Sequence, residues 1–101
     1  MPGKRKGDTK MLYVVSYDIP DDKRRQQIAN ALLDFGDRVQ YSVFEAILSG
    51  ELGEKMVASL TAIVCDEEDS VRIYRLCGEC KKAIKILGRG EISEDKEVYI
   101  L

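Results

Sequence analysis

Histidine is absent from this 101-residue chain. The side chains that remain for chemistry are carboxylates, arginines, tyrosines and three cysteines. Histidine is the usual general base near neutral pH and the commonest ligand of transition metals. Hydrolytic chemistry would therefore rest on carboxylates, on a hard metal ion, on tyrosine or on cysteine. The length allows one domain with one core and no second catalytic lobe.

Asp18 is the carboxylate with the most informative position. It follows the β-branched and aromatic run 11–17, typical of a buried strand, and it precedes Pro20, which stops a strand ladder. Its side chain is therefore expected to be exposed at a strand end. From the residues themselves, Asp18 is either a functional carboxylate or a residue that forms the turn into the following helix.

The charge balance does not favour binding of a polyanion. The net charge is −2, and without residues 1–10 there are 12 basic residues against 17 acidic ones. Affinity for nucleic acid would have to come from local basic clusters. Arg24 and Arg25 form one cluster, for which the residues themselves favour a solvated helix face. A second cluster could contact a nucleic-acid backbone or serve only as solubilising charge, and it comprises Arg72, Arg75, Lys81, Lys82 and Lys85.

The cysteines give a weak signal. An odd number, Cys65, Cys77 and Cys80, argues against a secreted disulfide framework. The CxxC motif at 77–80 is half of a tetrahedral zinc site, and only a second copy of the chain could complete it. Buried or turn cysteines are the favoured interpretation. With no signal peptide or membrane-spanning run in sight, we expect a cytoplasmic protein without membrane association.

Periodicity predicts the elements that position these residues. Asp21 or Asp22 caps a first helix, whose apolar stripe recurs at Ile28, Ala31, Leu32 and Phe35. Gly36 suits the left-handed position that ends a helix.

The rest of the chain also has patterns of apolar residues typical of strands and helices. Residues 38–49 read as one long strand or as two joined by a kink, and a second helix carries its apolar residues between 52 and 64. Further strands are predicted at 70–76 and at 83–87, the latter closed by Gly88 and Gly90. The order predicts a ferredoxin-like α+β fold, with both helices on one face of an antiparallel sheet.

The domain organisation predicted is a flexible basic arm at 1–10 and a single domain at 11–101. Within it, residues 91–101 form a polar linker and an apolar C-terminal strand. An unpaired apolar strand is an aggregation hazard, so it either folds back on its own sheet or, as we favour, joins the sheet of a partner subunit. The second arrangement implies a symmetric dimer.

Four stretches carry a resemblance to a known family. They are "YVVSYDI" ending at Ile19, "KRR" at 23–25, "GDRVQYSVFEA" at 36–46 and "DSVRIYRLC" at 69–77. Over residues 11–101 the chain resembles the Cas2 family of CRISPR-associated proteins. The third stretch is the most specific, because polar residues interrupt a strand in an order that propensity does not produce.

The resemblance implies a ferredoxin-like βαββαβ fold with an extra C-terminal strand, in a homodimer with facing sheets. It implies spacer acquisition, with metal-dependent endonuclease activity on single-stranded RNA or double-stranded DNA. The main alternative, also known in the family, is a non-catalytic adaptor that bridges dimers of the Cas1 integrase and DNA. A toxin-type RNA nuclease resembling virulence-associated protein D is a further alternative, which the third and fourth stretches fit less well.

The resemblance also assigns site residues. Asp18 would face its twin across the dimer axis and bind Mg²⁺ or Mn²⁺, since two facing carboxylates repel unless a cation or proton lies between them. The catalytic candidates are Asp18, Tyr17, Arg25, Arg38, Ser42 and Phe44. The nucleic-acid-binding candidates are Arg24, Arg25, Arg38, Arg72 and Arg75. Tyr17 and Phe44 are equally open to a role in core packing.

Overall fold

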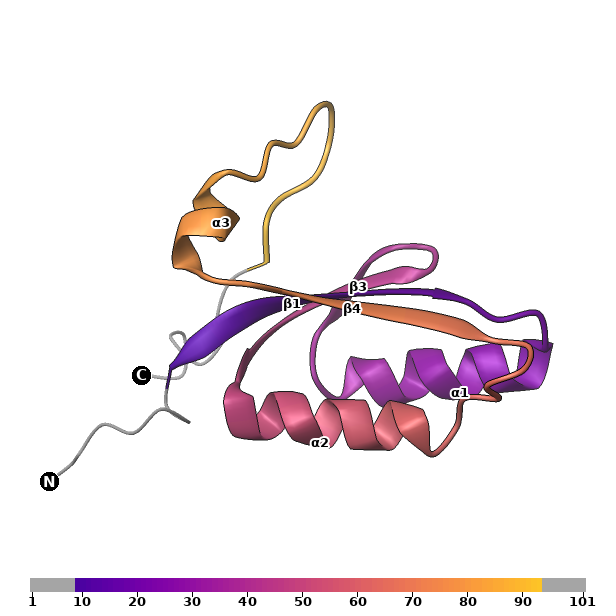
Figure 1. The fold of residues 1–101 in the computed structure, drawn as a ribbon. Helices are drawn as coiled ribbons and strands as arrows, with labels where there is room; N and C mark the ends of the chain where they lie inside the picture. The colour runs from indigo at the N-terminus through magenta and orange to yellow at the C-terminus, as the bar shows by residue number, and fades with distance from the viewer. Residues whose placement is uncertain (1–8, 94–101) are drawn as a thin grey trace, which may run out of the picture.

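A four-stranded antiparallel sheet with two long helices on one face makes up most of the computed structural model, which describes residues 9–93 (Figure 1). The elements in chain order are β1 (Lys10–Asp18), α1 (Asp22–Leu33), β2 (Asp37–Gln40), β3 (Val43–Ser49), α2 (Gly50–Thr61), β4 (Ser70–Leu76) and the short α3 (Gly78–Lys82). The strand order is β2-β3-β1-β4. This is the predicted ferredoxin-like topology, and that prediction is confirmed. No helix among residues 9–93 is long and apolar enough to cross a membrane.

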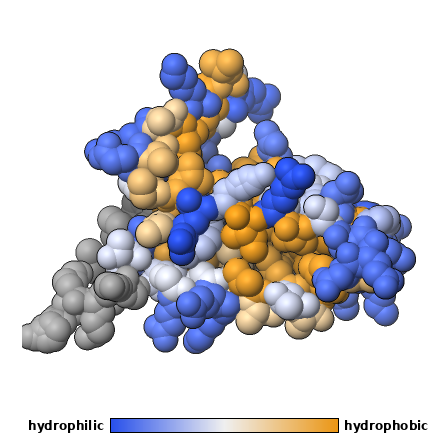
Figure 2. Space-filling view, viewed as in Figure 1, coloured by the Kyte–Doolittle hydropathy of each residue, from blue (hydrophilic) through white to orange (hydrophobic). Residues whose placement is uncertain are grey.

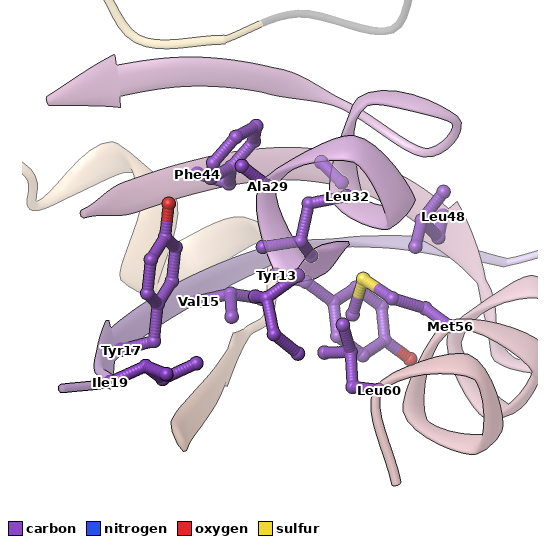
Figure 3. Packing of buried hydrophobic residues seen from close by; sticks show 12 residues of the cluster. Tyr13, Val15, Tyr17, Ile19, Ala29, Leu32, Phe44, Leu48, Met56 and Leu60 are labelled. Atoms are coloured by element: carbon purple, nitrogen blue, oxygen red, sulfur yellow. The ribbon is translucent and has the colours of Figure 1, made fainter. Parts of the chain in front are cut away.

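The core lies between the sheet and the helices α1 and α2 (Figure 3). Strand side chains alternate between the two faces of a sheet, so every second residue of β1 and of β3 enters this layer. The strand residues buried in this layer are Tyr13, Val15 and Tyr17 of β1 with Phe44, Ala46 and Leu48 of β3. The helices contribute Ile28, Ala29, Leu32, Met56 and Leu60. The other face of the sheet, called the open face below, is free of α1 and α2.

Side-chain caps fix the starts of both long helices. The Asp21 carboxylate accepts a hydrogen bond from the Arg24 backbone N–H at 2.8 Å, so Asp21 rather than Asp22 is the N-cap of α1. The Ser49 hydroxyl accepts one from the Leu52 N–H at 3.3 Å and caps α2. Ser49 also ends β3, and so the chain passes from strand to helix without a loop.

Gly36 is required for a different reason from the one predicted. Among residues 9–93, the glycines with positive φ are Gly88 and Gly90, so the predicted left-handed conformation of Gly36 is wrong. The backbone instead passes so close to β3 that a Cβ on Gly36 would overlap the Glu45 carbonyl oxygen and lie 2.6 Å from the Ala46 Cβ. Glycine at position 36, the first residue of the "GDRVQYSVFEA" stretch, therefore permits a close approach between two backbone segments.

The segment 38–49 is divided into two strands by a tight turn. Tyr41 and Ser42 join β2 to β3, and the pairing is irregular between Arg38 and Gln40. Neither turn residue is glycine or asparagine, which are the usual signals for a hairpin. The Ser42 carbonyl accepts a hydrogen bond from the Tyr17 N–H at 3.1 Å, so the neighbouring strand helps to hold this turn.

The predicted strand at 83–87 is not formed, and this prediction is wrong. The chain turns through α3 after β4, then runs over the open face without regular structure and returns to the sheet, where the Ser93 N–H donates to the Glu45 carboxylate at 3.1 Å (Figure 1). A strand needs a neighbouring strand for its backbone hydrogen bonds. The turn carries residues 83–87 away from the β4 edge, and Leu87 remains 91% exposed.

Two predictions fall partly or wholly outside the described residues. The basic arm was predicted at 1–10, of which the structure describes residues 9 and 10, and Lys10 already begins β1. The predicted C-terminal strand lies at 98–101, wholly beyond residue 93. The described residues therefore test neither prediction.

Candidate nucleic-acid and metal site

Asp18 ends β1 on the open face, where its side chain is exposed. The register with β4 places Asp18 opposite Ser70 and Ser16 opposite Arg72. Cross-strand neighbours point to the same face, so a carboxylate, two hydroxyls and a guanidinium gather there. The resulting open depression of about 280 Å³ is lined by Ser16, Tyr17, Asp18, Ser70, Arg72 and Tyr74.

A second hollow, of about 80 Å³, lies on the helix side of the sheet, between α1 and the β2–β3 turn. It is lined by Tyr17, Arg25, Gln26, Ala29, Arg38 and Tyr41. The predicted site is thus divided into an Asp18–Arg72 group on the open face and an Arg25–Arg38 group on the other. Tyr17 borders both hollows.

Tyr17 and Phe44 are core residues. The Tyr17 and Phe44 rings stack with centroids 6.2 Å apart and planes inclined by 30°. The Arg38 guanidinium lies over the Phe44 ring, 5.3 Å from its centroid. This is cation–π geometry, which orients Arg38 along the helix side of β2. Phe44 is 1% exposed, so it supports the site by packing and makes no surface of its own.

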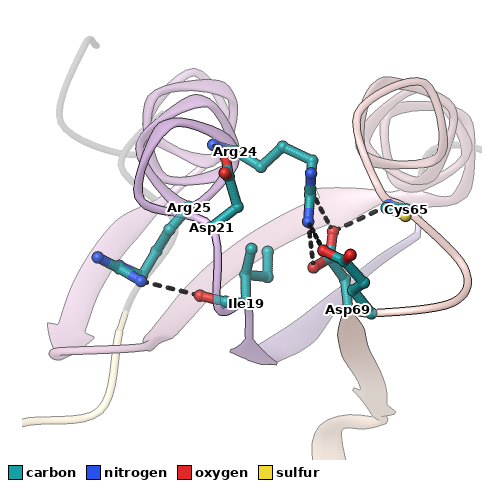
Figure 4. Close-up of polar contacts among 7 residues, drawn as sticks. Ile19, Asp21, Arg24, Arg25, Cys65 and Asp69 are labelled. Atoms are coloured by element: carbon teal, nitrogen blue, oxygen red, sulfur yellow. Dashed lines mark hydrogen bonds and ion pairs between the residues drawn. The ribbon is translucent and has the colours of Figure 1, made fainter.

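Arg25 joins the start of α1 to the end of β1. Its Nη1–H donates to the Ile19 carbonyl at 2.8 Å (Figure 4). Its Nη2 forms an ion pair with Asp22. The hydrogen bond that Arg25 donates to the Asp22 carboxylate raises the pKa of Arg25, which stays charged. The guanidinium therefore sets the position of the turn behind Asp18 while also lining the helix-side hollow.

Arg24 is turned toward the loop before β4. Its Nε and Nη2 donate to the two Asp69 carboxylate oxygens at 2.8 and 3.1 Å, and Nη2 also contacts Glu68 at 2.8 Å (Figure 4). The Asp69 side chain is 0% exposed and also accepts the Cys65 backbone N–H at 2.9 Å. Hydrogen bonds from Arg24 hold the pKa of Asp69 below its usual value. Arg24 is predicted to contact nucleic acid, but in this structure its guanidinium joins α1 to the loop before β4.

The remaining candidates lie apart from one another. Arg72 lines the Asp18 depression. Arg75 pairs with Tyr13 and so points toward the helix side, at the edge of the sheet. Ser42 acts through its backbone carbonyl, which holds Tyr17.

The carboxylates suit a metal only in part. Residues 9–93 contain no group of three or more cysteine, aspartate or glutamate side chains able to hold an ion. Asp18 offers one carboxylate, with the hydroxyls of Ser16 and Ser70 in the same depression. Mg²⁺ accepts one or two carboxylates when water and a phosphate supply its other ligands. Asp18 is therefore compatible with Mg²⁺ shared with a substrate or with a second copy of the chain.

Three residues of the depression were missed from the sequence. Ser16 lies two residues before Asp18 and shares its face, a signal that strand alternation already contained. Ser70 and Tyr74 share the face of Arg72 for the same reason. Their proximity to Asp18 depends on the β1–β4 register, however, and no sequence pattern specified that register.

The fold and the depression define a class: small ferredoxin-like α+β proteins with a carboxylate at the exposed end of the first strand. The family model described as CRISPR associated protein Cas2 matches residues 11–84. The chain belongs to the Cas2 family.

Individual relatives agree with this assignment. The CRISPR-associated endoribonuclease Cas2 3 of Synechocystis is 43% identical over 83 residues, which cover 82% of this chain and 90% of the relative. The crystal structure of the hypothetical protein TT1823 from Thermus thermophilus superposes with a TM-score of 0.73 at 41% identity, covering 84% of this chain and 99% of that one. A chain of a partial Cas6-RT-Cas1–Cas2 complex gives a TM-score of 0.65 at 26% identity, covering 76% and 90%.

Proposed function

We propose that this protein is a metal-dependent endonuclease of CRISPR spacer acquisition, with Asp18 as the metal ligand. The observation that carries the proposal is the placement of Asp18 and Arg72 in one open depression. A carboxylate there can hold a cation and a guanidinium can hold a phosphate, the two groups that phosphodiester hydrolysis requires. The Synechocystis relative is named an endoribonuclease, which favours single-stranded RNA as the first substrate to test.

The residues have distinct roles in this proposal. Asp18 holds the ion, and Arg72 orients a phosphate beside it. When bound, Mg²⁺ or Mn²⁺ supplies a water of lowered pKa and neutralises charge on the phosphate, so no histidine is needed. Arg25 and Arg38 contact the sugar-phosphate backbone of a longer nucleic-acid substrate, where it passes the end of the β-sheet toward the helix side.

A homodimer with facing sheets is part of the proposal. Large apolar side chains are exposed on the open face and on the projecting segment that follows α3. Tyr74 of the open face is 45% exposed, and Ile86 and Leu87 of the projecting segment are 40% and 91% exposed. Figure 2 shows hydrophobic side chains along this projecting segment. A second copy placed against the open face would cover them and bring a second Asp18 toward the first, and a cation would relieve the repulsion between the two carboxylates.

The decisive experiment measures cleavage of labelled single-stranded RNA and duplex DNA by the wild type and by Asp18→Asn, with Mg²⁺ and with EDTA. Asp34→Asn, which changes an exposed carboxylate just beyond the end of α1, is the matched control. We expect metal-dependent cleavage by the wild type and the control, and at least a hundredfold loss in Asp18→Asn. Equal cleavage by all three proteins would refute the role of Asp18.

The adaptor function is the second candidate. One carboxylate per chain is little for a dedicated nuclease, and a similar chain occurs in the solved partial complex that contains Cas1. An adaptor would retain Cas1 integrase binding and spacer capture in Asp18→Ala and would lose both when residues 97–101 are removed. A harmless deletion together with an indispensable Asp18 would reject the adaptor. The toxin-type alternative is disfavoured by the family match.

A further inference from the structure

Two cysteines outside the proposed nuclease site lie one helical turn apart. Cys77 directly follows β4 and occupies the N-cap position of α3, and Cys80 is the third residue of that helix. The N-cap and the third residue of a helix share its first turn, and here the two thiols lie close enough to share a hydrogen bond. The Lys81 N–H donates to the Cys77 carbonyl at 2.9 Å and closes this turn. Both cysteines are free and exposed, whereas Cys65 is partly buried.

The two thiols interact and are not equivalent. The backbone N–H of Cys80 and then the Cys80 thiol stabilise the Cys77 thiolate, which lowers the pKa of Cys77. Donating to Cys77 raises the pKa of Cys80. Lys81 and Lys10 line a small hollow together with Cys77.

We propose that Cys77 and Cys80 form a reversible dithiol–disulfide site that exchanges with low-molecular-weight disulfides. The Cys77 thiolate attacks one sulfur of the external disulfide, forms a mixed disulfide and releases one thiolate. The Cys80 thiolate then attacks the Cys77 sulfur, closes the Cys77–Cys80 bond and releases the second thiolate. The protein loses two electrons and two protons, and the external disulfide becomes two thiols.

The site lies where oxidation would affect the open face. Disulfide formation ties the end of β4 to α3, and α3 begins the segment that runs above the sheet and returns to it at Ser93. Cross-linking the first turn restricts how this segment can move. The chemistry of the site itself is independent of whether Asp18 supports nuclease activity.

The experiment equilibrates the reduced full-length chain with mixtures of oxidised and reduced glutathione, traps free thiols by alkylation and measures the intact mass. We expect the wild type to lose two hydrogens, with a peptide map showing a Cys77–Cys80 link that dithiothreitol reverses. Cys65→Ser is the matched control and is expected to behave in the same way.

Single substitutions separate the roles of the two sulfurs. Cys80→Ser cannot resolve the intermediate, so it should accumulate a glutathione adduct at Cys77. In alkylation assays, Cys77 in that variant should react several-fold faster than Cys80 in Cys77→Ser. Stable wild-type adducts at either cysteine, links only between chains, or a link that requires Cys65 would each overturn the proposal.

Discussion

At the scale of single residues, neighbours in sequence have opposite surroundings. Asp18 faces the open depression, while the Tyr17 ring is stacked on Phe44 beneath the helices. A strand forces this separation because successive side chains point to opposite faces. Loss of activity on substitution therefore indicates a change in the depression at Asp18 and a change in core packing at Tyr17.

Phe44→Ala should act through stability. Removing a fully buried phenylalanine typically costs about 3–5 kcal/mol, and here the change also removes the surface under Arg38. We expect the midpoint of denaturant unfolding to fall accordingly, with Phe44→Leu losing much less. An Ala variant that is as stable as the wild type but inactive would instead place Phe44 in the catalytic site.

At the scale of elements, the Arg24–Asp69 ion pair joins α1 to the loop before β4. The pKa of Asp69 is lowered in the fold, so the stability contributed by its ionised form is complete above the ordinary carboxyl value of about 3.9. That contribution is lost as the pH falls from there through the folded pKa. We expect Asp69→Asn to be less stable than the wild type at neutral pH, and the difference to shrink below about pH 4.

Glu68→Gln is the matched control for this prediction. Glu68 contacts the same guanidinium but is 59% exposed, so its loss should have a smaller effect. Urea unfolding of the three proteins from pH 3 to pH 7 makes the comparison. If both variants lost the same free energy of unfolding, burial of Asp69 would not strengthen its ion pair with Arg24.

Gly36→Ala should destabilise the connection between α1 and β2. The added methyl group meets the backbone of β3, which cannot move without disturbing the sheet, and overpacking of this kind costs about 1–3 kcal/mol. Gly50→Ala, at the first position of α2 with nothing within 4 Å of its added Cβ, should be neutral or stabilising by up to about 1 kcal/mol. Thermal unfolding of both variants measures the contrast, and similar behaviour would contradict the close approach.

At the scale of the whole molecule, the two faces of the sheet differ in what they offer to nucleic acid. Arg72 lies on the open face with Asp18, and Arg75 points toward the helix side. The net charge is −2, so binding depends on where the arginines are placed more than on the overall field.

Arg72→Gln should weaken binding of single-stranded RNA and reduce its salt dependence. Loss of one phosphate contact lowers the slope of log K against log salt by about 0.7 for a single strand. Fluorescence anisotropy in EDTA, which prevents metal-dependent cleavage, would measure this slope. Arg75→Gln is the control and should leave the slope unchanged, whereas the reverse result would move the binding surface to the helix side.

Much of the fold and one feature of the site were accessible from the sequence. The order of the expected strands and helices, read from features such as the stripe of the first helix, predicted the ferredoxin-like topology. The run before Asp18 predicted an exposed carboxylate at a strand end. These features depend on local periodicity, which the chain carries in the order of its residues.

Only the tertiary structure decided which groups meet. It brought Ser70, Arg72 and Tyr74 beside Asp18, turned Arg24 onto Asp69, placed Gly36 against β3 and left 83–87 without a strand partner. Each outcome depends on strand register or on contacts between segments far apart in the chain. Local propensity determines the type of an element, whereas long-range packing and hydrogen bonding determine what lies next to it.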